Sequence, residues 1–501
     1  MASHPLRLVR LGIDTHQEPV VYTRADCHVC RSEGFSAHSR VRIEANGATV
    51  VATLNVVHGD LLSADEAGLS EAAWGRLGVK PGGRARFSHA PPAESLRAMR
   101  AKTYGHALSD DQLAGIVRDV AARRYADIEI AALLTAFAAG GLSRSEVVGL
   151  TRAMVSAGDQ LHWPRAVVAD KHCVGGLPGN RTTPIVVAIV ASLGVWIPKT
   201  SSRAITSPAG TADAMEALTC VDLDLDQIRR VVEREGGCVA WGGAVGLSPV
   251  DDLLIRIERA LDIDSEGQLV ASVLSKKVAA GSTHVVIDIP VGPTAKVRDA
   301  ASAAALAQLL EETGKAFGIR MRSVISDGVA PVGRGIGPAL EARDVLSVLR
   351  GDADAPTDLA ARSTTLAGAV LELAGRCPAG TGEREAAAVL ADGSALRKFL
   401  AICDAQGGLR EPSRAAHRWT IEASESGSVA AIDNRQLARA AKLAGAPSSK
   451  AAGALMCARL GDTVARGQPL FELHAETTGE LDYARSYVAS HPNIVCVGTS
   501  R

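Results

Sequence analysis

From residue 166 to about residue 409 the chain alternates short apolar runs with helical segments, and this alternation restricts the fold more than any other feature. Residues 166–169 and 283–289 have the pattern of buried strands, whereas residues 226–234 and 300–313 have the spacing of helices. Runs that are apolar on both faces need cover on both sides of a sheet. We therefore expect a sheet flanked by helices, which is the α/β layer design.

Changes of pattern along the chain predict four domains. A single core stops growing near ~250–300 residues, and this chain has 501 residues. The predicted parts are an N-terminal β domain at 1–92, a helical domain at 93–165 that part of 250–280 joins, the α/β domain at 166–410 and a C-terminal α+β domain at 411–501. Within the helical part, Ser143 and Glu146 have the spacing of a capping box, so a helix should begin there.

Charge and hydropathy argue against two kinds of partner. The chain has 54 Lys and Arg against 55 Asp and Glu, so it lacks the basic stripe that a nucleic-acid backbone requires. Its longest apolar run, residues 184–198, is shorter than the ~20 residues of a membrane helix. Residues 1–10 contain no apolar segment of the kind found in secretory signals. We expect a cytoplasmic protein with no nucleic-acid and no membrane partner.

The nine cysteines are an odd number scattered over a long chain, which favours reduced thiols over a disulfide framework. Cys27 and Cys30 have the spacing of metal ligands, but no second pair lies nearby to complete a set of four. We therefore expect two small thiols on a turn and no metal.

A first anion site is predicted where the run 166–169 gives way to a helix at 185–193. The sequence between them, 170–183, reads DKHCVGGLPGNRTT. A glycine-rich turn at a helix N-terminus directs backbone N–H groups and the positive end of the helix dipole toward one place, which suits an anion. Lys171 and Thr183 add a charge and a hydroxyl. The alternative is a tight turn without a ligand, since the pattern is neither a P-loop nor GxGxxG.

A second such turn, residues 199–213, reads KTSSRAITSPAGTAD and precedes a predicted helix at 214–218. Hydroxyl groups donate hydrogen bonds and the guanidinium group of Arg203 binds bidentately, so both suit phosphate oxygens. Two anion-binding turns in one domain indicate substrates with two anionic groups. The alternative is a helix N-cap within a solvated Ser/Thr loop.

A third segment, residues 251–277, places several carboxylates near Arg256, Ser272 and Lys276. A general acid held near a phosphate site protonates a leaving base if burial keeps its pKa high enough. Spacing alone does not select one carboxylate, and most are expected to be solvated charges on helix faces.

In this order and spacing, the segments 171–176, 201–203, 210–213 and 272–277 resemble the thymidine/pyrimidine-nucleoside phosphorylase family. The fuller forms 176–183 and 202–207, together with the N-terminal β domain, look most like its AMP phosphorylase branch. The resemblance extends over about residues 1–490. It implies an α/β multidomain fold in which a helical bundle domain accompanies a large α/β domain of the nucleoside phosphorylase type II kind.

The resemblance also implies an activity. It indicates a pentosyltransferase that cleaves an N-glycosidic bond with inorganic phosphate as co-substrate, without another cofactor, in a homodimer or larger homo-oligomer. In the AMP branch the substrate would be a nucleoside 5′-monophosphate such as AMP, CMP or UMP, and the products free base and ribose 1,5-bisphosphate. The alternative is a thymidine phosphorylase, which yields thymine and 2-deoxyribose 1-phosphate.

Site residues carry over from the family position by position. The positions that match phosphate ligands are Lys171, Thr183, Ser201 and Thr211, and His172 faces the base or sugar. The positions that approach the base in pyrimidine enzymes are Arg256, which needs a one-residue gap in the alignment, Ser272 and Lys276. The positions that contact the nucleotide in the AMP branch are Gly176, Ser202, Arg203, Ala204, Ile205, Thr206, Ser207, Thr211, Ser272 and Lys296. The proton donor would be Asp264.

The chain departs from the family at Cys173, where a phosphate-binding serine is usual. A thiol is a much weaker hydrogen-bond donor than a hydroxyl. Either the phosphate shifts toward backbone N–H donors or it binds more weakly. A nucleophilic role for the thiol is not expected, because phosphorolysis needs none.

Two rival functions fit the sequence less well. Residues 333–337 read GRGIG before a predicted helix at 339–349, but the spacing is not that of a dinucleotide-binding oxidoreductase. Segments 201–203 and 210–213 also resemble anthranilate phosphoribosyltransferases, which share the fold. Those enzymes lack the terminal domains and the segment 272–277, so the phosphorylase prediction is preferred.

Overall fold

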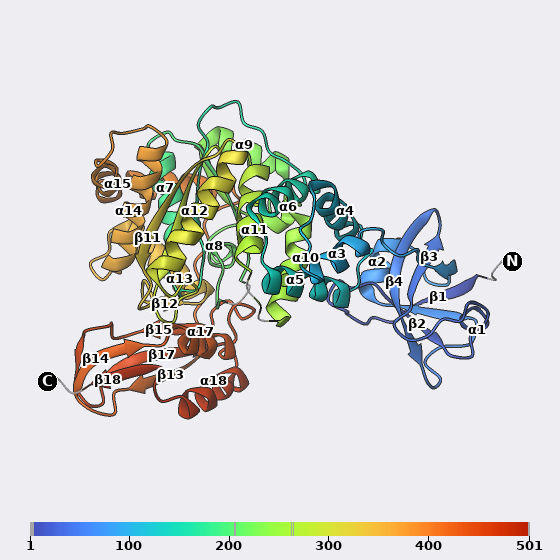
Figure 1. The fold of residues 1–501 in the computed structure, drawn as a ribbon. Coiled ribbons are helices and arrows are strands. Elements are labelled where there is room, and N and C mark those ends of the chain that lie inside the picture. Colours follow the sequence, from blue (N-terminus) through green and yellow to red (C-terminus); the bar gives the residue numbers. More distant parts are fainter. Residues whose placement is uncertain (1–4, 205–206, 262, 264, 499–501) are drawn as a thin grey trace. The chain divides into compact units, whose positions relative to one another are not determined.

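The computed structural model describes residues 5–204, 207–261, 263 and 265–498 (Figure 1). The chain divides into two compact units, Met1–Gly141 and Leu142–Arg501. The division falls inside the range 93–165, which the sequence predicts as one helical domain.

The first unit begins with a closed barrel in which six strands follow the order β1-β5-β2-β4-β3-β6. The strands are β1 (Leu6–Arg10), β2 (Val20–Arg24), β3 (Arg40–Ala45), β4 (Ala48–Val57), β5 (Glu66–Leu69) and β6 (Arg84–His89), with helices α1 (His28–Glu33) and α2 (Glu71–Leu77) between them. Cys27 and Cys30 are buried in the barrel core at the start of α1. Among the described residues, no group of three His, Cys, Asp or Glu side chains is placed to hold a metal ion.

Three helices complete the first unit: α3 (Leu96–Thr103), α4 (Asp110–Ala121) and α5 (Asp127–Gly140). Helix α4 buries Leu113, Ile116, Val117 and Val120, the stripe expected from its period. Ser109 caps its N-terminus in a capping box with Gln112.

The second unit opens with α6 (Arg144–Ser156), which packs against α11 (Glu266–Ala279). The capping box predicted at Ser143 and Glu146 is confirmed, because each side chain bonds the backbone N–H of the other residue. Helix α10 (Pro249–Leu261) precedes α11 and also contacts α6.

A parallel sheet organises the second unit. One part has the order β11-β10-β7 and the other pairs β8 with β9, with all neighbours parallel. The strands are β7 (Ala169–Cys173), β8 (Ile197–Ser201), β9 (Gly237–Trp241), β10 (His284–Val291) and β11 (Arg320–Asp327). The two parts join where Val168 forms a bridge with Trp196 and the N–H of Ala169 donates to the Trp196 carbonyl at 2.7 Å.

The expected strand at 166–169 is displaced, because β7 begins only at Ala169 and continues through charged residues to Cys173. The ladder with β10 starts at the pair Ala169 and His284. An apolar pattern misses this strand because its carboxylate, Asp170, is neutralised inside the protein by Lys199 and Lys277.

Helices cover both faces of the sheet (Figure 1). Val286 of β10 belongs to the core with α7, α14 and α16, while its neighbours Val285 and Ile287 belong to the core with α11 and α12. The helices of this region are α7 (Thr182–Ser192), α8 (Thr211–Glu216), α9 (Leu225–Glu235), α12 (Ala300–Ala316), α13 (Pro338–Arg350), α14 (Thr357–Leu373), α15 (Gly382–Ala391) and α16 (Ser394–Ala405), with the short 3-10 helix η1 (Gly242–Val245) after β9. The cover on two sides explains why β10 is buried on both faces, whereas β11 is partly exposed.

The C-terminal part is a mixed α+β structure with two antiparallel sheets, ordered β12-β15-β17-β13 and β16-β14-β18. Its elements are β12 (Gly335–Ile336), β13 (His417–Glu422), β14 (Gly427–Ile432), α17 (Asn434–Leu443), β15 (Gly453–Met456), β16 (Thr463–Val464), β17 (Pro469–Ala475), α18 (Thr478–Ser490) and β18 (Val495–Gly498). Strand β12 lies before α13 in the chain, so its pairing with β15 joins the C-terminal sheet to the α/β region.

The glycine-rich turn at 333–337 lies where the α/β region meets the C-terminal sheet, and it does not form an anion-binding site. Its backbone N–H groups donate to carboxylates: Gly333 to Asp358, Arg334 and Gly335 to Asp344, and Gly337 to Glu341. A Cβ atom at Gly337 would lie 2.3 Å from the Ala452 carbonyl oxygen, so glycine permits the close approach of the C-terminal strand. N–H groups already bound to carboxylates leave no cradle for the phosphates of a dinucleotide.

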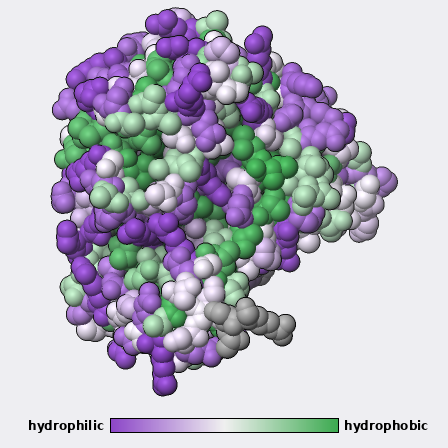
Figure 2. All heavy atoms as spheres, turned by 90° about the vertical axis from the view of Figure 1, so that its left-hand side faces the viewer, coloured by the Kyte–Doolittle hydropathy of each residue, from purple (hydrophilic) through white to green (hydrophobic). Residues whose placement is uncertain are grey.

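Hydrophilic and hydrophobic side chains are interspersed on the face shown in Figure 2. Among the described residues, no helix combines the length and the apolar character that crossing a membrane requires.

Candidate active site

The predicted site residues gather where β7 and β8 end. Both strands are followed by a turn and a helix, α7 or α8, and parallel strands place such turns at the same edge of a sheet. Arg181 joins the two turns, since its Nη1 donates to Thr211 Oγ1 at 2.8 Å and its Nη2 to the Ala209 carbonyl at 2.8 Å. The first residues of α7 and α8 are therefore close together.

Lys171 lies on β7 as a buried cation. Its Nζ donates to Thr182 Oγ1 at 2.6 Å, at the start of α7, and Thr183 is buried at the next position. Burial lowers the pKa of Lys171, while the negative charge of Asp288 on the neighbouring strand opposes this shift. A cation with so little contact with water is stabilised by an added anion.

A second group of buried charges lies beside Lys171. Asp170 accepts from Lys277 Nζ at 2.8 Å and has Lys199 Nζ at 3.5 Å, so two cations share one carboxylate. Burial, together with the charges of Lys277 and Lys199, lowers the pKa of His172 well below its usual value. At neutral pH the imidazole of His172 is therefore uncharged and offers one donor and one acceptor.

Cys173 ends β7 next to two polar residues, Asn180 and Asp288, for which the sequence patterns predict no role. Asn180 Nδ2 donates to Cys173 Sγ at 3.5 Å and to Asp288 Oδ2 at 3.4 Å. Burial, followed by the charge of Asp288, raises the pKa of Cys173 to about 12, so the thiol stays protonated. The detectable signal for Asp288 was a single carboxylate inside the apolar strand 284–291.

Ser201, the last residue of β8, is buried, and its Oγ makes no hydrogen bond with any described residue. Asn180 Oδ1 is likewise buried without a partner in the described part of the chain. Such orphaned polar atoms are rare unless a ligand or water satisfies them. Both stand at the edge where β7 and β8 end, where phosphate was expected.

Arg181 is anchored by a carboxylate that no sequence pattern singles out. Its Nε donates to Glu341 Oε2 at 2.6 Å, from the first turn of α13. Burial raises the pKa of Glu341 to about 7, although Arg181 and the Gly337 N–H act in the opposite direction.

The turn after β8 contains the six residues expected to contact a nucleotide. Ser202, Arg203, Ala204 and Ser207 are half-buried, and Ser207 Oγ donates to the Ala209 carbonyl at 2.9 Å. The predicted contacts at Ile205 and Thr206 lie outside the described residues. The guanidinium group of Arg203 was expected to meet a phosphate, but here it is bound by carboxylates.

Gly176 brings Lys296 to the same edge of the sheet. Its φ is +84°, and a Cβ atom built there would lie 2.4 Å from the backbone nitrogen of Lys296. Lys296 follows β10 in the chain and is half-buried. A side chain at position 176 would push these two segments apart.

The residues expected to approach the base lie on α10 and α11. Lys276 Nζ binds Asp251 Oδ2 at 2.5 Å and Ser272 Oγ at 3.1 Å, which links α11 to α10, and Arg256 belongs to α10. On α11, Lys277 follows Lys276 and its Nζ binds Asp170 of β7, so this helix lies close to the strand that carries Lys171. Asp264, the predicted acid, lies outside the described residues.

Comparisons with known protein families match two parts of the chain. Residues 96–158 match a family described as "Glycosyl transferase family, helical bundle domain". Residues 165–396 match one described as "Glycosyl transferase family, a/b domain".

Similar whole proteins share one name. A protein of Polaromonas sp. named "Putative thymidine phosphorylase" is 62% identical over 99% of this chain and 97% of its own length. The "Putative thymidine phosphorylase 2" of Acidovorax sp. is 59% identical over 98% of this chain and 96% of its own, and the relative from Legionella pneumophila is 55% identical over 99% and 96%. Among solved structures, the anthranilate phosphoribosyltransferase of Thermus thermophilus has a TM-score of 0.52 at 21% identity, covering 62% of this chain and 99% of that one, which shows a shared fold.

Proposed function

Because this chain belongs to the thymidine/pyrimidine-nucleoside phosphorylase family and is a pentosyltransferase, we propose that it cleaves a nucleoside 5′-monophosphate with inorganic phosphate. The products are the free base and ribose 1,5-bisphosphate. Inorganic phosphate is the co-substrate, no other cofactor takes part, and the enzyme works as a homo-oligomer.

The phosphate part of this proposal is supported by Ser201 Oγ, which is buried at the end of β8 and makes no hydrogen bond within the described part of the chain. A phosphate there accepts from the Ser201 hydroxyl, from the Lys171 ammonium and from the hydroxyls of Thr183 and Thr211. These donors stand on two strands and two helix N-termini, so they are fixed before the anion arrives. Water-poor surroundings strengthen each interaction with the phosphate charge.

The proximity of Lys296 to Gly176 supports a nucleotide rather than a nucleoside. Lys296 is a further basic residue whose backbone lies near Gly176, in addition to Lys171 on β7. In the sequence, the turn after β8 adds the hydroxyl residues Ser202 and Thr206 to those proposed for the attacking phosphate. The Ser207 hydroxyl already donates to the Ala209 carbonyl. A second anionic group, the 5′-phosphate of the substrate, uses the additional hydroxyl groups.

The proposed reaction uses the site in a fixed order. An oxygen of inorganic phosphate attacks C1′ of the ribose, and the C1′–N bond breaks as its electron pair leaves with the base. Uncharged His172 holds the base or sugar by hydrogen bonds, and Asp264 gives the leaving base its proton. The transition state resembles an oxocarbenium ion, which the incoming phosphate stabilises.

Thymidine is the second candidate substrate, because the relatives that match almost the whole chain bear the name "Putative thymidine phosphorylase". A phosphoribosyltransferase is a more distant candidate, since a solved structure of that class shares the fold. To separate phosphoribosyltransferase activity from phosphorolysis, the enzyme is assayed both with a pyrophosphoryl sugar as the substrate and with a nucleotide plus phosphate.

A specificity panel tests the substrate. We expect base release from AMP, CMP or UMP only when phosphate is present, with kcat/KM above that for thymidine and uridine. Release that does not depend on phosphate would make the enzyme a hydrolase. A clear preference for thymidine over every monophosphate would reject the nucleotide while keeping the family.

Replacing Cys173 by Ser is expected to lower the KM for phosphate about 3–10-fold, because a hydroxyl donates a stronger hydrogen bond to an anion than a thiol does. The KM for the nucleotide should change less than twofold. Initial rates at varied phosphate and saturating nucleotide measure the effect. Cys403→Ser, at a buried position of α16 in the hydrophobic core, is a control whose KM values stay unchanged. An unchanged KM in the Cys173 variant would place the phosphate away from this side chain.

A further inference from the structure

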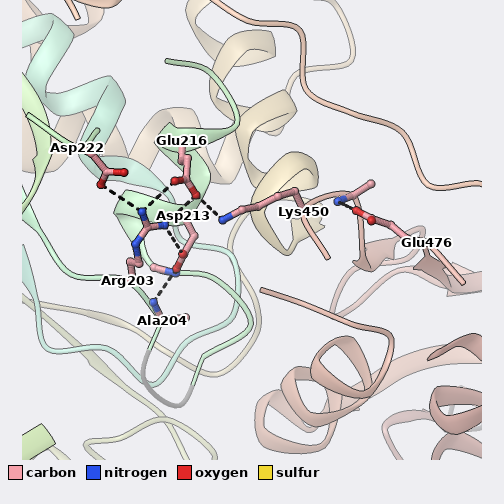
Figure 3. A network of polar contacts seen from close by, with 9 residues as sticks. Arg203, Ala204, Asp213, Glu216, Asp222, Lys450 and Glu476 are labelled. Carbon is pink, nitrogen blue, oxygen red and sulfur yellow. Dashed lines mark hydrogen bonds and ion pairs between the residues drawn. The ribbon is translucent and has the colours of Figure 1, made fainter. Parts of the chain in front are cut away.

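Arg203, in the turn after β8, is held by three carboxylates (Figure 3). Its two terminal nitrogens bind Glu216 at 2.8 and 2.9 Å, and they lie 3.5 Å from Asp213 and 3.3 Å from Asp222. The guanidinium plane also covers the ring of Trp241, with its carbon 4.5 Å from the ring centre. The bidentate face of Arg203 is therefore occupied by Glu216.

Asp213 fixes the backbone of the same turn from the first turn of α8. Its Oδ2 accepts from the N–H of Ala204 at 2.6 Å and from the N–H of Gly210 at 2.8 Å. The two ends of the turn are therefore tied to one carboxylate. Through Asp213 and Glu216, helix α8 therefore binds both the backbone of this turn and the Arg203 side chain.

Lys450 of the C-terminal part completes the network, because its Nζ binds Glu216 Oε2 (Figure 3). The backbone of Lys450 is anchored on both sides. Its carbonyl accepts from the Ala339 N–H of α13 at 3.0 Å, and the next N–H, of Ala451, donates to Glu476 at 2.8 Å. The position of the Lys450 side chain thus depends on the fold of the C-terminal sheet.

Glu216 is the shared partner of both cations. Arg203 first, and Lys450 next, lower the pKa of Glu216 to about 2, so the carboxylate stays charged at neutral pH. When Lys450 is absent, Arg203 is the one remaining partner of Glu216 among the described residues, and the Glu216 side chain that orients Arg203 gains freedom. The turn then has to be ordered by the ligand, which weakens binding.

We propose that Lys450 is a positioning residue that acts through Glu216 and Arg203 to hold the backbone of Ser202–Ala204, at the start of the turn after β8, in the shape that receives the 5′-phosphate. This inference rests on the proposed function and deepens it. Lys450 does not touch the substrate. It makes recognition of the nucleotide depend on a residue of the C-terminal domain.

The experiment compares Lys450→Met, Lys450→Arg and a matched control, Lys398→Met, in the full-length enzyme. Lys398 also pairs with a glutamate, Glu235 at 3.0 Å, and its side chain is 25% exposed against 39% for Lys450, but it lies on α16 away from the turn. We expect Lys450→Met to raise the KM for the nucleotide about 3–10-fold, the range for a partly exposed charged pair. In Lys450→Met, the KM for phosphate and the kcat should stay within twofold of wild type. Lys450→Arg should have the wild-type KM for the nucleotide. Lys398→Met should change none of these values.

Glu216→Gln is a second variant that loosens both cations, and a larger rise in the nucleotide KM is expected. An unchanged nucleotide KM in Lys450→Met, or equal rises for nucleotide and phosphate, would overturn the positioning role while leaving the nucleotide substrate standing. A wild-type enzyme that prefers thymidine to every monophosphate would instead reject the substrate, and the role of Lys450 with it.

Discussion

Replacing Lys171 by Met is expected to lower kcat/KM for phosphorolysis by about 10²–10³-fold, the usual cost of removing one preorganised group that stabilises charge in an active site. Lys171 is almost completely buried, and its Nζ lies 2.6 Å from Thr182 Oγ1 at the N-terminus of α7. A cation in this position pairs with the incoming phosphate with little screening by water. The loss should appear chiefly as a higher KM for phosphate, measured at saturating nucleotide.

Stability has to be separated from catalysis in this test. Lys171→Met removes a cation whose charge acts on the buried carboxylate of Asp288, and a buried carboxylate with less compensating charge lowers the stability of the fold. Lys171→Met combined with Asp288→Asn should recover much of the lost melting temperature. It should not recover phosphorolysis. Activity within tenfold of wild type in either variant would show that phosphate is held elsewhere.

The sequence predicts the order strand, turn and helix at these two places, because local pattern determines it. A glycine-rich turn between a buried strand and a helix needs no knowledge of distant residues, but β7 and β8 extend to Cys173 and Ser201, inside the two ranges that the pattern predicts as turns. The phosphate binding that we propose for them rests on the same local geometry, namely helix N-termini that direct N–H groups toward one edge. The six-stranded barrel follows less directly, since alternating runs predict strands but not the order in which they close.

Pairing between distant charges is what the sequence does not reveal. Asp170 lies in a buried strand because Lys199 and Lys277 neutralise its charge. The hydrophobic periodicity of the sequence does not predict these two ion pairs. The sequence predicts Arg203 as a phosphate ligand. The structure shows that Arg203 binds Glu216 and that Glu216 in turn binds Lys450. Glu216 and Lys450 are separated by 234 positions. Polar networks of this kind are specified by tertiary structure, so the spacing of residues in the sequence does not reveal them.

Replacing Asp264 by Asn is expected to lower turnover by about 10²–10⁴-fold while leaving nucleotide binding nearly intact, as for the loss of a general acid. The choice of Asp264 comes from the family resemblance, because the residue lies outside the described part of the chain. An aspartic acid in water titrates near ~3.9. A general acid at neutral pH therefore needs surroundings that favour its protonated form. Single-turnover rates with AMP, alongside calorimetric binding of AMP, measure the two quantities separately.

The leaving group distinguishes an acid from a residue that merely supports the fold. A base that leaves readily without protonation needs the acid less, so the deficit of Asp264→Asn should shrink for substrates with more acidic leaving bases. The alkaline limb of the kcat profile, where wild type loses the acid's proton, should also disappear in the variant. Asp252→Asn, an exposed carboxylate on α10, is the matched control and should retain wild-type turnover and pH profile. An equal deficit for every leaving base, with the alkaline limb retained, would assign the proton to another group, because only the true donor couples the rate to the basicity of the base.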